Sequence, residues 1–189
     1  MGNVVKSCGE MTLIGLNALL SGEQLWFRTR VKSHILHARI PSFGTKILNI
    51  VDGIEYYTQT GSEVILKGTC GEQSVISLDY LLNNYTLANG AAITRAYIER
   101  KLFKGTYFTV KPKVYDAYDT WAFHIPASVQ GRIVTPAGQY LTLNSGVAAL
   151  PHNMGDFIIA SDLHGEPNRN CMRVVNGCIF KNTYDTSNM

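Results

Sequence analysis

The spacing of apolar and polar positions along the chain predicts three helical stretches separated by short extended segments. Apolar residues recur at helical intervals over 11–21 and 91–103, and each run is followed closely by a glycine that can end a helix. A third run, 78–84, follows Ser77, and serine is a favoured N-cap residue. We therefore expect two longer helices and one short one.

The remaining apolar positions favour strands. Asp52-Gly53 lies between two apolar runs, which is a strong hairpin signal. Pro112 cannot donate a ladder hydrogen bond, so it predicts an edge strand or the start of a strand. The expected strands cover 63–67 and 73–76, with longer extended segments over 25–38 and 106–118.

The order of these elements occurs twice, which indicates an internal duplication. Residues 31–38, 60–72 and 75–85 lie over 110–117, 154–166 and 174–184, with ten identities in 32 positions, where average composition predicts about two. In this alignment Asn176 lies over Ser77. It therefore predicts a second short helix over 177–183 rather than a hairpin at Asn176-Gly177.

These patterns predict an α+β fold of two tandem repeats. Each repeat would be a helix followed by a small antiparallel β-sheet or partial barrel and a short C-terminal helix. Residues 1–89 would form the first, shorter repeat, and 90–189 the second, which carries an insertion within 118–154. Two similar β-meanders with shared turn residues are the alternative.

The insertion is where we expect a site, because long irregular connections are more often functional than the framework. Aromatic side chains can stack on bases and basic ones can pair with phosphates. A lid over the core or an oligomer contact would explain the same segment, and Trp121 and Tyr140 would then be core residues. The candidate ligand-binding residues are Lys111, Lys113, Tyr115, Trp121, His124, Arg132, Tyr140, His152, Arg169 and Arg173.

Composition narrows the classes of function. Apolar residues make up 46% of the chain and charged residues 16%, with a net charge of +3, too small to indicate a nucleic-acid partner. Four cysteines without CxxC spacing, and no signal peptide, predict free thiols in an intracellular protein. No apolar run has transmembrane length.

Catalytic, metal and cofactor motifs are also missing from the sequence. The spacing of His152, Asp156, Asp162 and His164 matches no metal site, so we expect turn and surface roles for them. We expect no cofactor and no bound metal.

Four stretches resemble a known group of proteins. They are Lys111-Pro112 to Ala117, Gly155 to Ile159, Gly165-Glu166, and Phe180 to Tyr184-Asp185. Together they are similar to the small tailed-phage and prophage proteins grouped by a Pro-Gly-Asp-Tyr-Gly motif. Met154, Phe157, Ala160 and Asp185 depart from that pattern. The resemblance implies a phage origin and a role in the cytoplasm of an infected bacterium, but it transfers no activity.

We therefore expect a non-enzymatic phage accessory protein that counters host defence by sequestering a small anionic, nucleotide-type ligand. A pocket lined by Trp121, Tyr140 and two basic residues would favour this hypothesis. An exposed apolar surface would favour a protein–protein inhibitor of a host or defence protein. A virion or assembly component, or a ligand-degrading enzyme with His124, His152 or His164 as acid or base, are further alternatives. We also expect self-association and no membrane partner.

Overall fold

A computed structural model describes residues 6–11, 15, 26–49, 55–59, 61–102, 105–114, 117–144 and 154–189. Four expectations fall outside these ranges: the helix over 11–21 apart from Met11 and Gly15, the turn at Asp52-Gly53, and the candidate site residues Tyr115 and His152.

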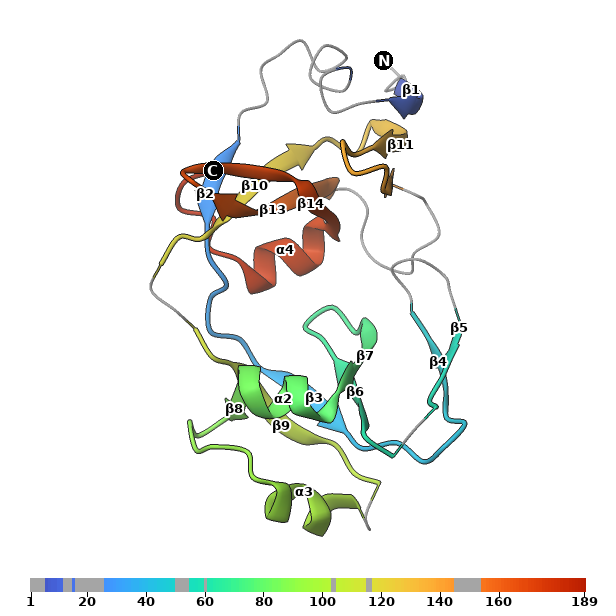
Figure 1. Cartoon of the computed structure of the whole chain (residues 1–189), viewed down its shortest axis with the longest axis vertical. Helices are drawn as coiled ribbons and strands as arrows, with labels where there is room; N and C mark the ends of the chain where they lie inside the picture. Colours follow the sequence, from blue (N-terminus) through green and yellow to red (C-terminus); the bar gives the residue numbers. More distant parts are fainter. Residues whose placement is uncertain are drawn as a thin grey trace. The chain divides into compact units, whose positions relative to one another are not determined.

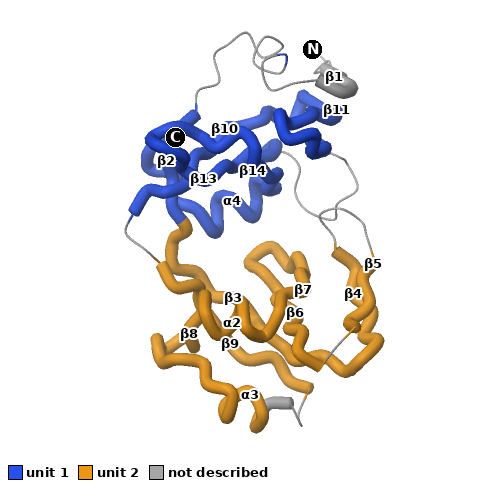
Figure 2. The backbone as a smooth tube through the Cα atoms, viewed as in Figure 1, with its two compact units in different colours: residues 1–30, 116–189 blue, residues 31–115 orange. Residues whose placement is uncertain are grey.

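The chain forms two compact units, which Figure 2 shows in different colours. Unit 2 is the continuous segment 31–115, and unit 1 combines 1–30 with 116–189. The elements of unit 2 are β3 (Leu36–Arg39), β4 (Lys46–Leu48), β5 (Glu55–Tyr57), β6 (Glu63–Lys67), β7 (Gln73–Ser77), α2 (Leu78–Asn84), β8 (Tyr85–Leu87), α3 (Arg95–Leu102) and β9 (Phe108–Pro112). Those of unit 1 are β1 (Lys6–Met11), β2 (Phe27–Thr29), β10 (Thr120–Ile125), β11 (Val129–Val134), β12 (Tyr140–Leu143), β13 (Asp156–Leu163), β14 (Glu166–Asn176) and α4 (Gly177–Thr183).

Unit 2 is built on a five-stranded antiparallel sheet with strand order β7-β6-β3-β9-β8 (Figure 1). Its core combines β6 residues such as Val64 and Leu66 with Leu81 of α2 and Ile98 of α3. Strands β4 and β5 form a separate two-stranded hairpin, as the flanks of Asp52-Gly53 predict.

Unit 1 contains a four-stranded sheet, β14-β13-β10-β2, and a three-stranded sheet, β1-β11-β12. Residues of the two sheets, including Phe123, Leu143 and Ile158, share one buried cluster. Helix α4 packs on the other face of β13, where the Phe157 and Phe180 rings stack at 3.8 Å. The four-stranded sheet therefore lies between a second sheet and a helix.

The two large sheets share one strand order. Strands β7, β6, β3 and β9 of unit 2 correspond to β14, β13, β10 and β2 of unit 1, and a short helix follows β7 and β14 alike. The first expected extended stretch, 25–38, contains β2 of unit 1 and most of β3 of unit 2, whereas the second, 106–118, contains β9 of unit 2 and ends before β10 of unit 1. Because unit 2 is the continuous segment 31–115 and unit 1 takes residues from before and after it, the compact units do not divide at residue 89.

The expected fold class is wrong. Strands account for most of the regular structure in the described residues, and the helices there are three short ones, so the fold is not a helix-first α+β repeat. The main reason is that 118–154, read as an irregular insertion, supplies strands β10, β11 and β12. The alternation of exposed and buried positions in β12 covers only four residues, and the glycines and polar residues around it obscure the strand pattern.

Several local predictions are confirmed. Ser77 and Asn176 are the N-caps of α2 and α4, and their side chains accept hydrogen bonds from the backbone N–H groups of Tyr80 and Cys178. Helix α3 occupies most of the 91–103 run. Pro112, however, is the last residue of β9, an interior strand, where it faces Tyr85 of β8.

Candidate functional site

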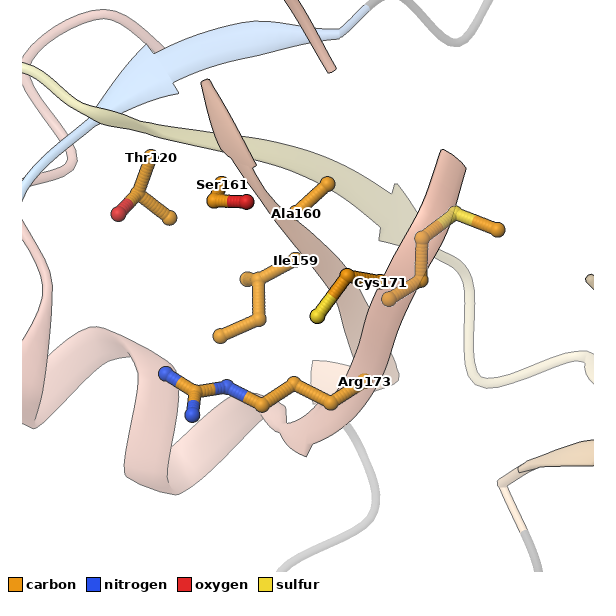
Figure 3. Close-up of a pocket in the computed structure, with 7 residues that line it drawn as sticks. Thr120, Ile159, Ala160, Ser161, Cys171 and Arg173 are labelled. Atoms are coloured by element: carbon orange, nitrogen blue, oxygen red, sulfur yellow. The ribbon is translucent and has the colours of Figure 1, made fainter. Parts of the chain in front are cut away.

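A pocket of about 200 Å³ opens in unit 1 beside an irregular part of the β13–β14 ladder (Figure 3). It lies on the face of β13 against which α4 packs, because Phe157, Ile159 and Ser161 alternate onto that face. Its lining residues are Thr120, Ile159, Ala160, Ser161, Cys171, Met172 and Arg173.

An irregularity in strand pairing accompanies this pocket. Ala160 faces Met172, but two residues further along β13 Asp162 faces Pro167. Residues 168–171 of β14 thus have only Ser161 opposite them, which is a β-bulge. We attribute the open space beside Ser161 to this bulge, since the ladder does not close over it.

The polar groups of the lining come from three neighbouring strands. Thr120 of β10 and Ser161 of β13 are directly paired, so their hydroxyl groups lie on the same face of the sheet. Arg173 of β14 is exposed, and its Nη2 donates a hydrogen bond to the Tyr184 hydroxyl at 3.0 Å. Ile159 and Ala160 add apolar surface. The pocket therefore offers one cation, two hydroxyls and an apolar wall.

Cys171 contributes a thiol to the same lining. It is a free, exposed cysteine, and in Figure 3 its side chain extends to the same side of β14 as that of Arg173. Cys70 and Cys178 are each disulfide-bonded, so the expectation of free thiols is wrong for these two residues.

Trp121 belongs to a different cluster. Its indole N–H donates to the Asp162 carboxylate at 2.8 Å, and the Arg28 guanidinium lies 4.6 Å from its ring centroid. Arg28 also pairs with Asp162 at 2.8 Å. The hydrogen bond from Trp121, followed by one from the Gly165 backbone, lowers the pKa of Asp162. All three side chains are thus engaged with one another and tie β2 to the sheet.

Arg132 and Tyr140 do come together, but away from the pocket. The Arg132 guanidinium lies 4.5 Å from the Tyr140 ring centroid, and both side chains are exposed on the β11–β12 ladder. His124 is in contact with the Phe157 ring, and its Nε2 hydrogen-bonds the Met154 carbonyl at 2.9 Å. This histidine therefore bonds a backbone carbonyl rather than a carboxylate.

The two candidate lysines are in unit 2. Lys113 donates through Nζ to the Asn83 carbonyl at 2.6 Å and to the Leu82 carbonyl at 3.4 Å. These are the last carbonyls of α2, so the side chain neutralises the negative end of the helix dipole. Lys111 is half-buried in β9 and pairs with Thr86 of β8.

Arg169 and Arg173 are the last two candidate ligand-binding residues. Both are exposed on β14, but only Arg173 lines the pocket. The expected combination of Trp121, Tyr140 and two basic residues is therefore not formed. Sequence reasoning missed Thr120, Ser161 and Cys171. The one signal near them is that the alignment of the two halves leaves 167–173 opposite only 73–74, so the second half is longer at this point.

No group of three His, Cys, Asp or Glu residues that could hold a metal ion occurs in the described ranges. Across the same ranges, no helix combines the length and the apolar character needed to cross a membrane. The sequence matched no protein-family model, no curated protein and no solved structure.

Proposed function

We propose that this chain is a non-enzymatic binding protein that holds a small anionic ligand in the pocket of unit 1. The observation that carries the proposal is Arg173 in that lining, on the same sheet face as the hydroxyl groups of Thr120 and Ser161. An arginine guanidinium pairs well with planar or tetrahedral anions, and the Ser161 hydroxyl can donate to the same ligand. The Thr120 hydroxyl donates to the Asp119 carboxylate at 3.2 Å. The lining includes no histidine and no carboxylate to act as acid or base.

The size of the pocket limits what it can enclose. Sites for drug-sized ligands measure roughly 300–1,000 Å³, and this pocket measures about 200 Å³. A complete cyclic dinucleotide would not fit inside. A nucleotide-type ligand would place only an anionic group there and leave its bases outside.

The biological role that we propose is sequestration. A protein without a catalytic constellation can act stoichiometrically by holding a ligand away from its receptor. The similarity of 111–185 to the small phage proteins supports a phage origin, and a phage protein that sequesters a ligand of host defence would counter that defence. That similarity is the basis for placing the protein in the bacterial cytoplasm.

A retention assay tests the proposal. The purified chain is incubated with cyclic dinucleotides, cyclic trinucleotides, ADP-ribose derivatives and short carboxylates, washed, denatured, and the released material identified by mass spectrometry. We expect at least one ligand to be released intact at one equivalent, and Arg173→Gln to reduce retention about 10-fold, as expected when a charge-assisted hydrogen bond is lost. Arg169→Gln, an exposed arginine on the same strand, is the matched control.

Two results would contradict the proposal. Recovery of a chemically modified ligand would make the protein an enzyme. Retention of none of the compounds would remove the small-anion hypothesis.

A second function is favoured by the β4–β5 hairpin. Its outward face carries Leu48 and Tyr57, which are 50% and 53% exposed, and Phe43 beside it is 80% exposed. Lys46 and Glu55 form an ion pair at 2.6 Å across the same face. Exposed aromatic groups of this kind mark protein contacts, and this is the surface that a protein–protein inhibitor would need.

We propose that the occupant of this surface is a second copy of the chain. Each copy carries one positive charge, Lys46, and one negative charge, Glu55, on this face. Two antiparallel hairpins can therefore meet without placing like charges opposite each other. Sedimentation velocity over a range of concentrations should show a dimer that Phe43→Ser combined with Tyr57→Ser dissociates. A monomer at all concentrations would contradict self-association through the hairpin.

A further inference from the structure

The five-stranded sheet of unit 2 has a buried face and a polar face. Apolar residues such as Ala38 and Val110 alternate onto the face that packs against α2 and α3. Side chains one position along each strand point the other way, and we call the side on which they lie the outer face. On the central strands the outer face carries His37 and Arg39 of β3, Lys67 of β6, Thr109 and Lys111 of β9 and, just before β9, Tyr107.

Strand pairing places basic residues of the outer face side by side. His37 is paired with Lys67 on one side and with Thr109 on the other, and all three residues are exposed. Lys111 is two residues farther along β9, about 7 Å beyond Thr109. The ammonium groups of Lys67 and Lys111 have no hydrogen-bond or ion-pair partner among the residues that the structure describes. Their charges are therefore available to an external partner.

The opposite end of the outer face carries a cation and an aromatic ring in contact. The Arg39 guanidinium lies 5.3 Å from the centroid of the Tyr107 ring, and Tyr107 is 40% exposed. The Nε of Arg39 has no hydrogen-bond partner, so its contact within the described ranges is the ring and not a carboxylate. Tyr107 is four residues before Lys111, which places the two ends of this set of side chains about 14 Å apart.

The acidic residue of the outer face lies at the edge of this set. It is Glu63, at the end of β6 remote from Lys67. Its carboxylate accepts a hydrogen bond from the Gln59 backbone N–H at 2.6 Å. The basic side chains of β3, β6 and β9 thus face solvent without a carboxylate between them.

We propose that the outer face of unit 2 binds single-stranded nucleic acid, an activity separate from anion binding in the pocket of unit 1. Backbone phosphates would lie over β3 and β9 and accept hydrogen bonds from Lys67, His37 and Lys111. A base would stack on the exposed ring of Tyr107, with the Arg39 guanidinium beside it. Basic side chains that follow the backbone, together with an aromatic ring that receives an unstacked base, are the two parts of single-strand recognition.

The aromatic ring favours a single strand over other anionic partners. An acidic protein or a DNA duplex could pair with the cations, but neither presents an unstacked base to Tyr107. The small net charge of the chain, +3, sums over all 189 residues. Binding of an anionic polymer depends instead on where the charges are concentrated, and on the outer face they are basic.

Fluorescence anisotropy with labelled oligo-dT and oligo-U tests the proposal. Strands of about 12 nucleotides are suitable, since single-strand-binding domains cover roughly 4–16. The full chain should bind them at low salt, and Lys111→Gln should reduce the slope of log affinity against log salt by about 0.7, the value for one phosphate contact. Tyr107→Ala should weaken binding about 10-fold without changing the slope, because stacking is not ionic. Tyr107→Phe, which keeps the ring, should bind like the unmodified chain.

Two further variants are the controls. Arg100 is an exposed cation on α3, away from the outer face, so Arg100→Gln should leave binding and its salt slope unchanged. Arg173→Gln alters the pocket of unit 1 and should also leave oligonucleotide binding unchanged, which keeps this test distinct from that of the proposed function. Circular dichroism confirms that each variant is folded.

Three results would overturn the proposal. Binding of polyglutamate without binding of the oligonucleotides would make the outer face a site for an acidic protein. Equal affinity for a duplex and a single strand, with Tyr107→Ala binding like the unmodified chain, would exclude recognition of an unstacked base. Absence of binding to every oligonucleotide at low salt would exclude a nucleic-acid partner.

Discussion

The carboxylate of Glu72 lies over Gly68, in the space that a side chain at position 68 would need. The turn between β6 and β7 is closed by this contact together with two backbone features. The Gly68 N–H donates to the Glu72 carbonyl at 2.7 Å, and the Cys70 N–H donates to the Glu72 carboxylate at 2.9 Å. Glu72 thus has a structural role in this turn.

Substitution of Gly68 tests this contact. Gly68→Ala should displace the Glu72 side chain and lose its hydrogen bond with Cys70, reducing the free energy of unfolding by about 1–2 kcal/mol. In a Glu72→Ala background the same substitution should have a smaller effect, because the colliding carboxylate is gone. Urea denaturation of the four proteins gives the coupling energy, and a coupling energy of zero would show that the two residues are not in contact.

The protonation of Glu72 gives a pH dependence with a defined sign. Burial raises the pKa of this carboxyl group above its ordinary 4.5, although hydrogen bonds from its turn and the nearby His34 oppose the effect. Because the folded state binds the proton more tightly, ionisation of Glu72 lowers stability as pH rises from 4.5 through the raised value.

Glu72→Gln keeps the shape and an acceptor for Cys70 but cannot ionise. The variant should therefore gain stability relative to the unmodified chain on going from pH 4 to pH 7, as measured by thermal unfolding. If Glu72→Gln stabilises the protein more at pH 4 than at pH 7, the pKa of Glu72 is not raised.

Asp185 should show the opposite behaviour. Hydrogen bonds from Ser187, followed by one from the Tyr118 hydroxyl, lower the pKa of Asp185 to about 2. Its stabilising effect is present above its ordinary pKa of 3.8 and is lost as pH falls from 3.8 toward 2. Asp185→Asn should therefore lower the melting temperature at pH 6 and have little effect near pH 2.

Asp79→Asn is the matched control for Asp185. Asp79 pairs with Arg95 at 2.7 Å, but their side chains are 74% and 66% exposed, and exposed ion pairs contribute little. An equal decrease in melting temperature for Asp185→Asn and Asp79→Asn at pH 6 would contradict the stabilising role of Asp185.

Gly155 precedes β13 in a crowded left-handed conformation, with φ at +68°. A Cβ there would meet the Ile125 carbonyl oxygen, which belongs to the backbone and cannot move aside. Gly155→Ala should reduce the free energy of unfolding by about 3 kcal/mol or more. Gly138 has a similar φ of +79° but no neighbour within 4 Å of a Cβ, so Gly138→Ala should cost only about 1 kcal/mol. Equal decreases in the free energy of unfolding would show that crowding at Gly155 does not cause the destabilisation.

The parts of the fold that could be predicted are those set by local chemistry. Ser77 and Asn176 cap their helices because a side-chain oxygen reaches the N–H groups of the first turn, and both residues are next to the helices that they start. The duplication helped at Asn176, where Asn-Gly alone would have indicated a hairpin. Over β6 and β13 the sequence alignment is displaced by one residue, because it pairs Gly61 with Gly155. In the structure the residue equivalent to Gly155 is Ser62: their carbonyls accept the corresponding hydrogen bonds from the backbone N–H groups of Gly177 and Leu78.

Strand partners could not be predicted in this way. Phe27 pairs with Ala122 and Phe108 with Ala38, and nothing in a short window around any of these residues specifies so distant a neighbour. The pocket was missed for the same reason. It arises from a bulge opposite Ser161, and a bulge depends on the register between two strands rather than on the residues of either one.

The central claim is that Arg173 and its neighbours bind a small anion. Titration of the ¹⁵N-labelled chain with propionate, followed by amide chemical shifts, tests it most directly. The account predicts saturable shifts centred on Ser161, Cys171 and Arg173, no comparable shifts with propionamide, and loss of the response in Arg173→Gln. Equal shifts with propionate and propionamide, or shifts centred away from the β13–β14 bulge, would contradict it.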